Sequence, residues 1–147
     1  MRWAAASIVA SLAWTACSLA GIDRPVNIEP GKDFNLKPGQ SALAPGANWR
    51  VGFEGVTADS RCPKGERCVW AGDATVRVSL QQASGPKQMA ELHTAQGAVQ
   101  SVRMLGVEVR LLRLEPYPVS GKTLTSQDYV ATLTVPLAPS PAAAAER

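Results

Sequence analysis

One long stretch of alternating apolar and polar residues constrains the fold of this chain more than any other feature. From residue 68 to residue 81, apolar or small residues occupy every second position, and mostly polar residues lie between them. The first set is Cys68, Trp70, Gly72, Ala74, Val76, Val78 and Leu80, and the second is Val69, Asp73, Thr75, Arg77, Ser79 and Gln81. A period of two places the two sets on opposite faces of a β-strand. The pattern therefore predicts a long strand with Cys68 and Trp70 on its buried face.

Other segments predict further strands. Residues 49–53 alternate, and their phase shifts at Gly55, as at a β-bulge. Residues 129–135 also alternate, whereas residues 107–114 change phase midway, which fits either a bulge or burial of both faces. Weaker strands are expected at 34–36, 40–43, 88–94 and 101–105. Gly and Pro turn signals separate these segments. Seven or eight short strands predict an all-β fold, an antiparallel β-sandwich or a partly open barrel.

The N-terminus has the composition of an export signal. A basic residue precedes a short, alanine-rich apolar run with small residues at its end, which is typical of a secretory signal peptide. Two cleavage frames stay open. Removal of residues 1–16 would use the frame 14–17, WTAC, which resembles the lipobox of bacterial lipoproteins, and the sulfur of Cys17 would then carry lipid. Removal of residues 1–20 would instead leave a soluble periplasmic or secreted protein.

The three cysteines need an explanation, because an odd number is unusual in an exported chain. If Cys17 carries lipid, Cys62 and Cys68 remain as a pair, and an oxidising compartment favours a disulfide between them. Closing so short a loop contributes only about 2 kcal/mol, so the bridge shapes a loop more than it holds the fold. A zinc site needs about four ligands, and the exported chain adds only His93. The C-x5-C spacing also differs from that of redox pairs. We expect no metal and no cofactor.

Composition divides the exported chain into a tether, one domain and a tail. Residues 17–32 contain the lipid-anchor site and a stretch rich in Pro and Gly, which predicts a flexible tether. Residues 33–137 suffice for one core. Residues 138–147, rich in Ala and Pro, predict a disordered tail. After removal of the signal segment with Arg2, the chain has fourteen basic and twelve acidic residues. The basic residues do not cluster with aromatic ones in the sequence. Both observations predict that the protein has no nucleic-acid partner.

The most specific stretch is DSRCPKGERCVWAG, residues 59–72. It combines the expected bridge with a charged turn and a tryptophan. Because Cys68 and Trp70 share the inward face of the predicted strand, we expect the indole to pack beside the bridge and to order one end of the sandwich. The turn residues Lys64, Glu66 and Arg67 form a candidate binding loop.

The block DSRCP, four residues and then CVWAG resembles a motif of uncharacterised bacterial secreted proteins and lipoproteins. The similarity extends to the segments 129–131 and 114–116, so it spans most of the mature body. The resemblance implies an exported β-domain that can be lipid-anchored. It implies no activity, cofactor or catalytic residue.

Enzymatic interpretations lack a recognisable motif. Ser60, His93 and either Asp59 or Asp128 could be combined as a hydrolase triad, but the chain has no G-x-S-x-G nucleophile elbow. His93 is better explained as a polar strand residue. Glycoside hydrolysis needs two acids facing each other across a cleft, and the candidates are Glu54, Asp59, Glu66 and Asp73. We expect no catalytic residue, and we expect that the protein is not an enzyme.

These features favour a binding or structural domain of the bacterial cell envelope. In enteric bacteria, an aspartate directly after the lipidated cysteine resembles a signal that retains a lipoprotein in the inner membrane. This chain has Ser18 at that position. The expected location is therefore the outer membrane, facing the periplasm. The expected partners are the membrane, through lipid on Cys17, and another envelope protein or a polysaccharide. The alternative is an inhibitor of a secreted protease, in which Lys64 or Arg67 enters a trypsin-like pocket from a loop that the bridge pre-orders.

Overall fold

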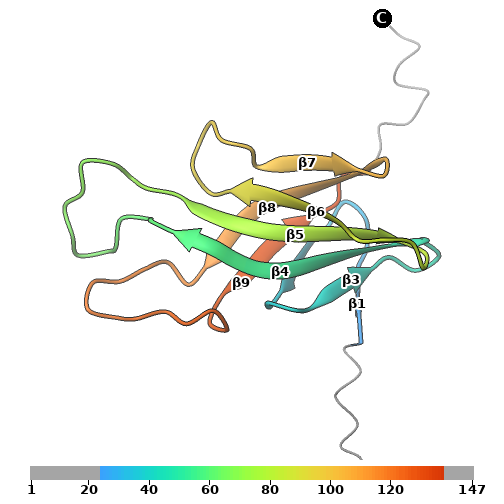
Figure 1. The fold of residues 1–147 in the computed structure, drawn as a ribbon, viewed down its shortest axis with the longest axis horizontal. Coiled ribbons are helices and arrows are strands. Elements are labelled where there is room, and N and C mark those ends of the chain that lie inside the picture. Colours follow the sequence, from blue (N-terminus) through green and yellow to red (C-terminus); the bar gives the residue numbers. More distant parts are fainter. Residues whose placement is uncertain (1–23, 138–147) are drawn as a thin grey trace, which may run out of the picture.

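The computed structural model describes residues 24–137 as two β-sheets packed face to face (Figure 1). These residues contain nine strands and no helix. The strand order is β1-β3-β4-β5-β6 in the first sheet and β2-β9-β8-β7 in the second. The prediction of a β-sandwich is confirmed, with one strand more than the largest number expected.

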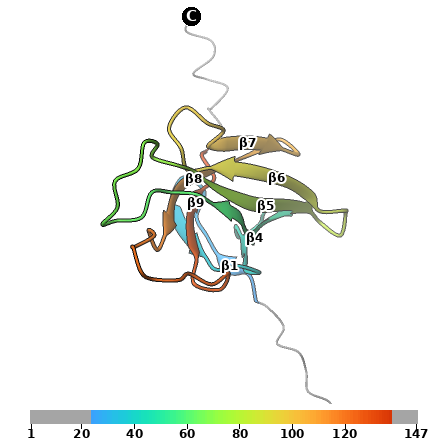
Figure 2. The same cartoon turned by 60° about the vertical axis from the view of Figure 1, so that its left-hand side comes forward.

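The nine strands are short at the edges and longest in the centre of the first sheet. The first sheet consists of β1 (Val26–Asn27), β3 (Ser41–Leu43), β4 (Trp49–Asp59), β5 (Ala74–Gln82) and β6 (Gln88–His93). The second sheet consists of β2 (Asp33–Leu36), β7 (Ser101–Met104), β8 (Val107–Glu115) and β9 (Val130–Thr134). All neighbouring strands are antiparallel except β1 and β3, which are parallel. Figure 2 shows how the strands of the two layers lie across one another.

The core between the sheets is apolar. In β5, Ala74, Val76, Val78 and Leu80 are fully buried, as their alternation predicts, because successive side chains of a strand point to opposite faces. Phe53 of β4 is fully buried as well. Complete burial of such a side chain contributes about 1.5–3 kcal/mol.

Both predicted phase shifts occur in the structure. The register of β4 and β5 shifts between Phe53 and Gly55, and Gly55 has a φ of 143°, which favours glycine. The register of β8 and β9 shifts between Leu111 and Arg113. Leu112 is 46% exposed, so a bulge, rather than burial of both faces, explains the change of phase in β8.

The predicted tether at 17–32 overlaps with the folded body. β1 pairs with β3, and Ile28 is buried and donates its N–H to the carbonyl oxygen of Leu43 at 3.1 Å. The sandwich therefore includes Val26, and the predicted start at Asp33 is wrong. A two-residue strand has no alternation by which its sequence could reveal it.

Three predictions concern residues outside the described range. They are the signal peptide at 1–16 or 1–20, the lipidation of Cys17 and the tail at 138–147. Within residues 24–137, the structure has no helix long and apolar enough to cross a membrane.

Candidate functional site

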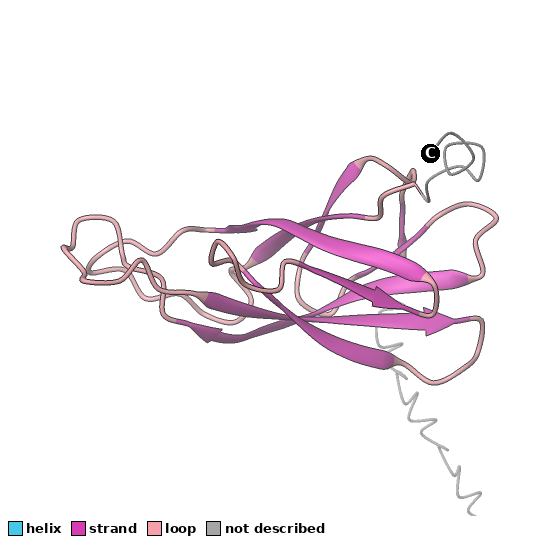
Figure 3. Ribbon diagram, turned by 90° about the horizontal axis from the view of Figure 1, so that it is seen from above, coloured by secondary structure: helices cyan, strands magenta, loops and turns pink. Residues whose placement is uncertain are grey.

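Two long loops extend beyond the sheets at the same end of the sandwich (Figure 1 and Figure 3). Residues 60–73 connect β4 to β5, and residues 116–129 connect β8 to β9. In Figure 1 these loops lie at the left, and β1 lies towards the opposite end. We call residues 60–73 and 116–129 the two-loop end. It contains nearly all of the DSRCP to CVWAG block.

The base of the 60–73 loop continues the β4–β5 ladder. The N–H of Ser60 donates to the carbonyl of Asp73 at 2.7 Å, and the N–H of Cys62 donates to the carbonyl of Ala71 at 2.8 Å. Gly72 has a φ of 73°. A Cβ at this position would collide with the carbonyl oxygen of Ser60, so the base of the loop requires glycine there.

The side chain of Arg61 connects the 60–73 loop to the second sheet through hydrogen bonds. Its side chain is only 5% exposed, and Nε and Nη2 donate to the two carboxylate oxygens of Asp59 at 2.9 and 2.7 Å. Nη1 donates to the carbonyl of Leu114 at 2.9 Å, and Nη2 donates to that of Pro116 at 3.0 Å. A buried charge is tolerated when it is paired and hydrogen-bonded in this way. The guanidinium therefore joins the loop to the end of β8.

Tyr129 completes the surroundings of Asp59 by donating its hydroxyl to Oδ2 at 3.1 Å. Burial alone would raise the pKa of Asp59, but the hydrogen bonds and charge of Arg61 and the hydroxyl of Tyr129 hold that pKa below its ordinary value. Burial, followed by the charge of Asp59, raises the pKa of Tyr129. Asp59 is therefore ionised at neutral pH, and its carboxylate oxygens accept hydrogen bonds from Arg61 and Tyr129.

The predicted disulfide between Cys62 and Cys68 is confirmed. The turn that it closes is also held by an aromatic ring. Cζ of Arg61 lies 5.1 Å, and Nζ of Lys64 lies 5.5 Å, from the centre of the Tyr117 ring, distances at which a cation is attracted to an aromatic face.

The candidate binding residues differ in how they are held. The N–H of Lys64 donates to the carbonyl of Pro118 at 2.9 Å, and its carbonyl accepts the N–H of Ser120 at 3.0 Å. Glu66 accepts the hydroxyl of Ser120 at 2.9 Å. Arg67 is exposed and forms no ion pair within residues 24–137. Lys64 and Glu66 therefore help to join the two loops, and Arg67 projects into solvent.

Trp70 is exposed, and the prediction that it packs under the sheet is wrong. Its residue exposure is 81%, and that of Val69 is 90%, the two highest among large apolar residues in the described part of the chain. β5 begins only at Ala74, because Gly72 adopts a positive φ that no extended strand has. The alternation at 68–72 is therefore not that of a strand.

Nδ1 of His93 lies 2.6 Å from Oδ2 of Asp73, within hydrogen-bonding distance. The other oxygen of Asp73 accepts the N–H groups of Thr94 and Ala95, each at 2.9 Å. Burial alone would raise the pKa of Asp73, but the hydrogen bonds from His93, Ala95 and Thr94 hold it below its ordinary value. This carboxylate thus fixes the turn that follows β6.

The residues considered for catalysis are engaged in other contacts. Ser60 donates its hydroxyl to the carbonyl of Asp73 at 3.0 Å. The acid beside His93 is Asp73, and Asp128 accepts the N–H of Thr125 at 2.7 Å. The four carboxylates considered for glycoside hydrolysis have separate partners, which are Ser79 and Lys87 for Glu54, Arg61 for Asp59, Ser120 for Glu66 and His93 for Asp73.

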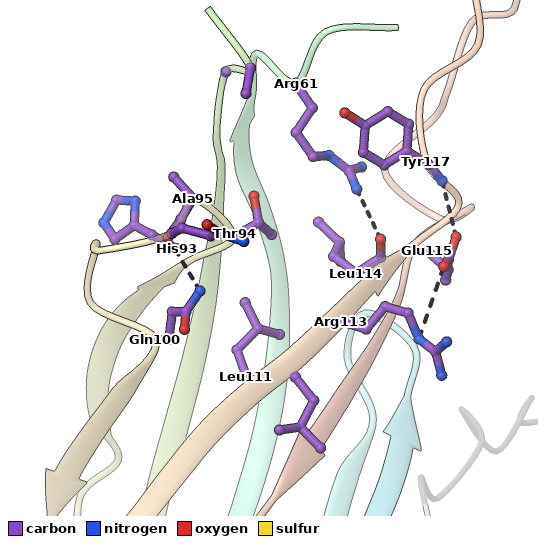
Figure 4. A pocket seen from close by; sticks show the side chains of 14 residues that line it. Arg61, His93, Thr94, Ala95, Gln100, Leu111, Arg113, Leu114, Glu115 and Tyr117 are labelled. Atoms are coloured by element: carbon purple, nitrogen blue, oxygen red, sulfur yellow. Dashed lines mark hydrogen bonds and ion pairs between the residues drawn. The ribbon is translucent and has the colours of Figure 1, made fainter. Parts of the chain in front are cut away.

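A cavity of about 580 Å³ lies at the base of the two-loop end, between the turn after β6 and the end of β8 (Figure 4). Leu111 and Leu114 line it together with Arg61 and Tyr117, and Thr94 lies on the other side. Within residues 24–137, no three His, Cys, Asp or Glu side chains are placed to hold a metal ion. Both apolar and polar residues line the cavity.

Comparisons with protein families, with curated proteins and with solved structures found no match for this chain.

Proposed function

We propose that this chain is an exported protein of the bacterial cell envelope whose β-sandwich is a binding module. In this proposal, Val69 and Trp70 at the two-loop end are the residues that meet the partner. Lipid on Cys17 would hold the protein to the outer membrane, with the module facing the periplasm. The signal-like N-terminus and the resemblance of the DSRCP to CVWAG block to lipoproteins support this location.

The observation that carries the proposal is the contrast within the block at residues 59–72. Asp59 and Arg61 form the buried ion pair, the two cysteines form the bridge, and Gly72 permits the base of the loop. Val69 and Trp70 instead project into water at exposures of 90% and 81%. An exposed indole contributes little to the stability of its own chain. Large aromatic side chains dominate contact energy when a partner buries them.

The rigidity of the loop is consistent with a binding role. The ladder at its base, the buried Arg61, the bridge and the contacts of Lys64 with Pro118 and Ser120 each restrict its conformation. A loop that is already ordered loses less conformational entropy when it binds. The separate engagement of the candidate catalytic residues also favours binding over catalysis.

Site-specific photocrosslinking in the native cells tests this proposal. A benzophenone side chain replacing Trp70 should form crosslinked products with an envelope component. The same side chain at Met89, which is 50% exposed on β6 of the first sheet, is the matched control and should form far fewer. Equal or absent crosslinking at the two positions would overturn the proposal.

A second candidate function is inhibition of a secreted trypsin-like protease. It is favoured by Arg67, which is exposed within the disulfide-closed turn and projects into solvent. Lys64 lies against the Tyr117 ring, so it is the less accessible of the two basic residues. Titration against trypsin-like proteases should show inhibition that Arg67→Ala abolishes and Lys64→Ala largely retains. No inhibition by the wild-type protein removes this candidate.

A further inference from the structure

Three basic side chains accompany the exposed Val69 and Trp70 at the two-loop end. They are Lys64, Arg67 and Lys122, and none of them forms an ion pair with a carboxylate within residues 24–137.

The same segments contain three acidic residues, and each of them accepts hydrogen bonds. Asp73 lies 2.6 Å from Nδ1 of His93 and accepts the N–H groups of Thr94 and Ala95. Glu66 accepts a hydrogen bond from Ser120 at 2.9 Å. Asp128 accepts the N–H and the hydroxyl of Thr125 at 2.7 and 2.8 Å. Hydrogen bonds from neutral groups leave a carboxylate charged, so the charge of these segments is the balance of four basic residues (Arg61, Lys64, Arg67 and Lys122) against three acidic ones (Glu66, Asp73 and Asp128). The balance is +1, and this positive excess favours an anionic partner.

The position of these residues limits the shape of that partner. The two loops are the part of the fold that extends farthest along its long axis, away from β1 (Figure 1 and Figure 3). A stable protein interface usually buries about 800 Å² on each partner, with roughly 20–30 residues a side. Two adjacent apolar side chains on a protruding loop form a much smaller contact. A lipid surface, unlike a protein partner, can bind such a loop without having a pocket of complementary shape.

We infer that the two-loop end inserts Val69 and Trp70 into the headgroup region of a bilayer that contains anionic phospholipid. The indole has an apolar body and an N–H donor, a combination enriched where a bilayer meets water. Arg67 and Lys122 face the anionic headgroups, and each basic side chain near such a surface strengthens binding about fivefold. This inference rests on the proposed function, because it names the surface that the binding module contacts.

Vesicle sedimentation tests the inference directly. The protein used is the chain from Ser18 to Arg147, which contains every described residue and lacks the cysteine proposed to carry lipid. The vesicles contain phosphatidylethanolamine and phosphatidylglycerol, or phosphatidylcholine alone. We expect binding to the anionic vesicles at least about tenfold tighter than to the neutral ones, since two or more basic groups contribute.

Three variants identify the groups that are responsible. Trp70→Ala should weaken binding to the anionic vesicles about tenfold or more, and the double change Arg67→Gln and Lys122→Gln should weaken it roughly 25-fold. Met89→Ala, at an exposed apolar residue of β6, should leave binding unchanged. The fluorescence of the wild-type protein should shift to the blue on binding, and Trp70→Phe should lack that shift.

The inference is wrong if the wild-type protein sediments with neither kind of vesicle above the level seen without vesicles. It is also wrong if Trp70→Ala and Met89→Ala weaken binding to the anionic vesicles equally. If the vesicles fail to bind while the benzophenone at position 70 crosslinks to an envelope protein, the lipid inference fails and the proposed binding function stands. If neither experiment gives binding, both fail.

Discussion

Replacing Arg61 with methionine should destabilise the domain more than any other single change of a charged residue at the two-loop end. Methionine keeps an unbranched side chain but removes the charge. Asp59, whose side chain is 10% exposed, would keep only the hydroxyl of Tyr129 and a backbone N–H as donors. The carbonyls of Leu114 and Pro116 would lose the donors they have in the structure. Removing one partner of a buried ion pair costs about 3–5 kcal/mol.

Urea denaturation followed by far-ultraviolet circular dichroism measures this loss. The free energy of unfolding of a small domain falls by about 1–3 kcal/mol per molar urea, so the midpoint should fall by roughly 2 M. The matched control is Arg110→Met, because Arg110 is half-exposed and pairs with Glu108 at 3.0 Å on the surface. Such a pair contributes less than about 1 kcal/mol. Similar midpoint shifts for the two variants would show that the ion pair at Asp59 is not important for stability.

The pH dependence of the same variant provides an independent check. In the wild type, the lowered pKa of Asp59 means that its contribution to stability is present above the unfolded pKa, about 4, and is lost as the pH falls through the folded pKa. Without Arg61, burial dominates and raises the pKa of Asp59, so the deficit should be largest at neutral pH and should shrink towards pH 4. Adding Asp59→Asn to Arg61→Met should then restore part of the stability at pH 7. No recovery in the double variant would contradict this explanation.

Further changes test the loop and the anchor. Gly72→Ala should lower the melting temperature more than Gly121→Ala, because both positions have positive φ but only at Gly72 would a Cβ collide with the backbone; equal losses would show that the collision is relieved. Trp70→Ala should change the free energy of unfolding by less than about 0.5 kcal/mol, whereas Phe53→Ala in the core should cost about 3–5 kcal/mol; a large loss for Trp70→Ala would place the indole in a packed site. Cys17→Ser should move the protein from the membrane fraction to the soluble periplasmic fraction, or block its maturation; a wild-type protein that is already soluble would exclude the lipid anchor.

The sheets could be predicted from the sequence wherever one face of a strand is buried and the other is solvated. Ala74 to Val78 have that arrangement, and their alternation identified the core of β5. The same alternation failed at Trp70, because periodicity records the identities of residues and not the backbone angles. The positive φ of Gly72 interrupts the extended chain between Trp70 and Ala74.

The candidate site could be predicted only in part. The bridge between Cys62 and Cys68 followed from the number of cysteines and from the oxidising compartment that the N-terminal segment leads us to expect. The role of Arg61 did not, because an arginine is buried only when acceptors surround it, and two of its acceptors are the carbonyls of Leu114 and Pro116, more than fifty positions later. A pattern among neighbouring residues cannot indicate a hydrogen bond to backbone carbonyls that lie far away in the sequence. An arginine two residues after an aspartate, in a stretch rich in cysteine and glycine, was the only available signal.

The pairing of β2 with β9 has a consequence for the order in which the domain can be assembled. β9 is the last of the nine strands in chain order, yet it lies between β2 and β8 in the second sheet. Asn35 and Thr132 are register partners 97 positions apart, and pairings of such long range form slowly. A chain that emerges N-terminus first, from a ribosome or through a membrane pore, therefore leaves Phe34 and Leu36 without their pairing strand until residue 134 has arrived. Until then, those two side chains are available to chaperones and to aggregation.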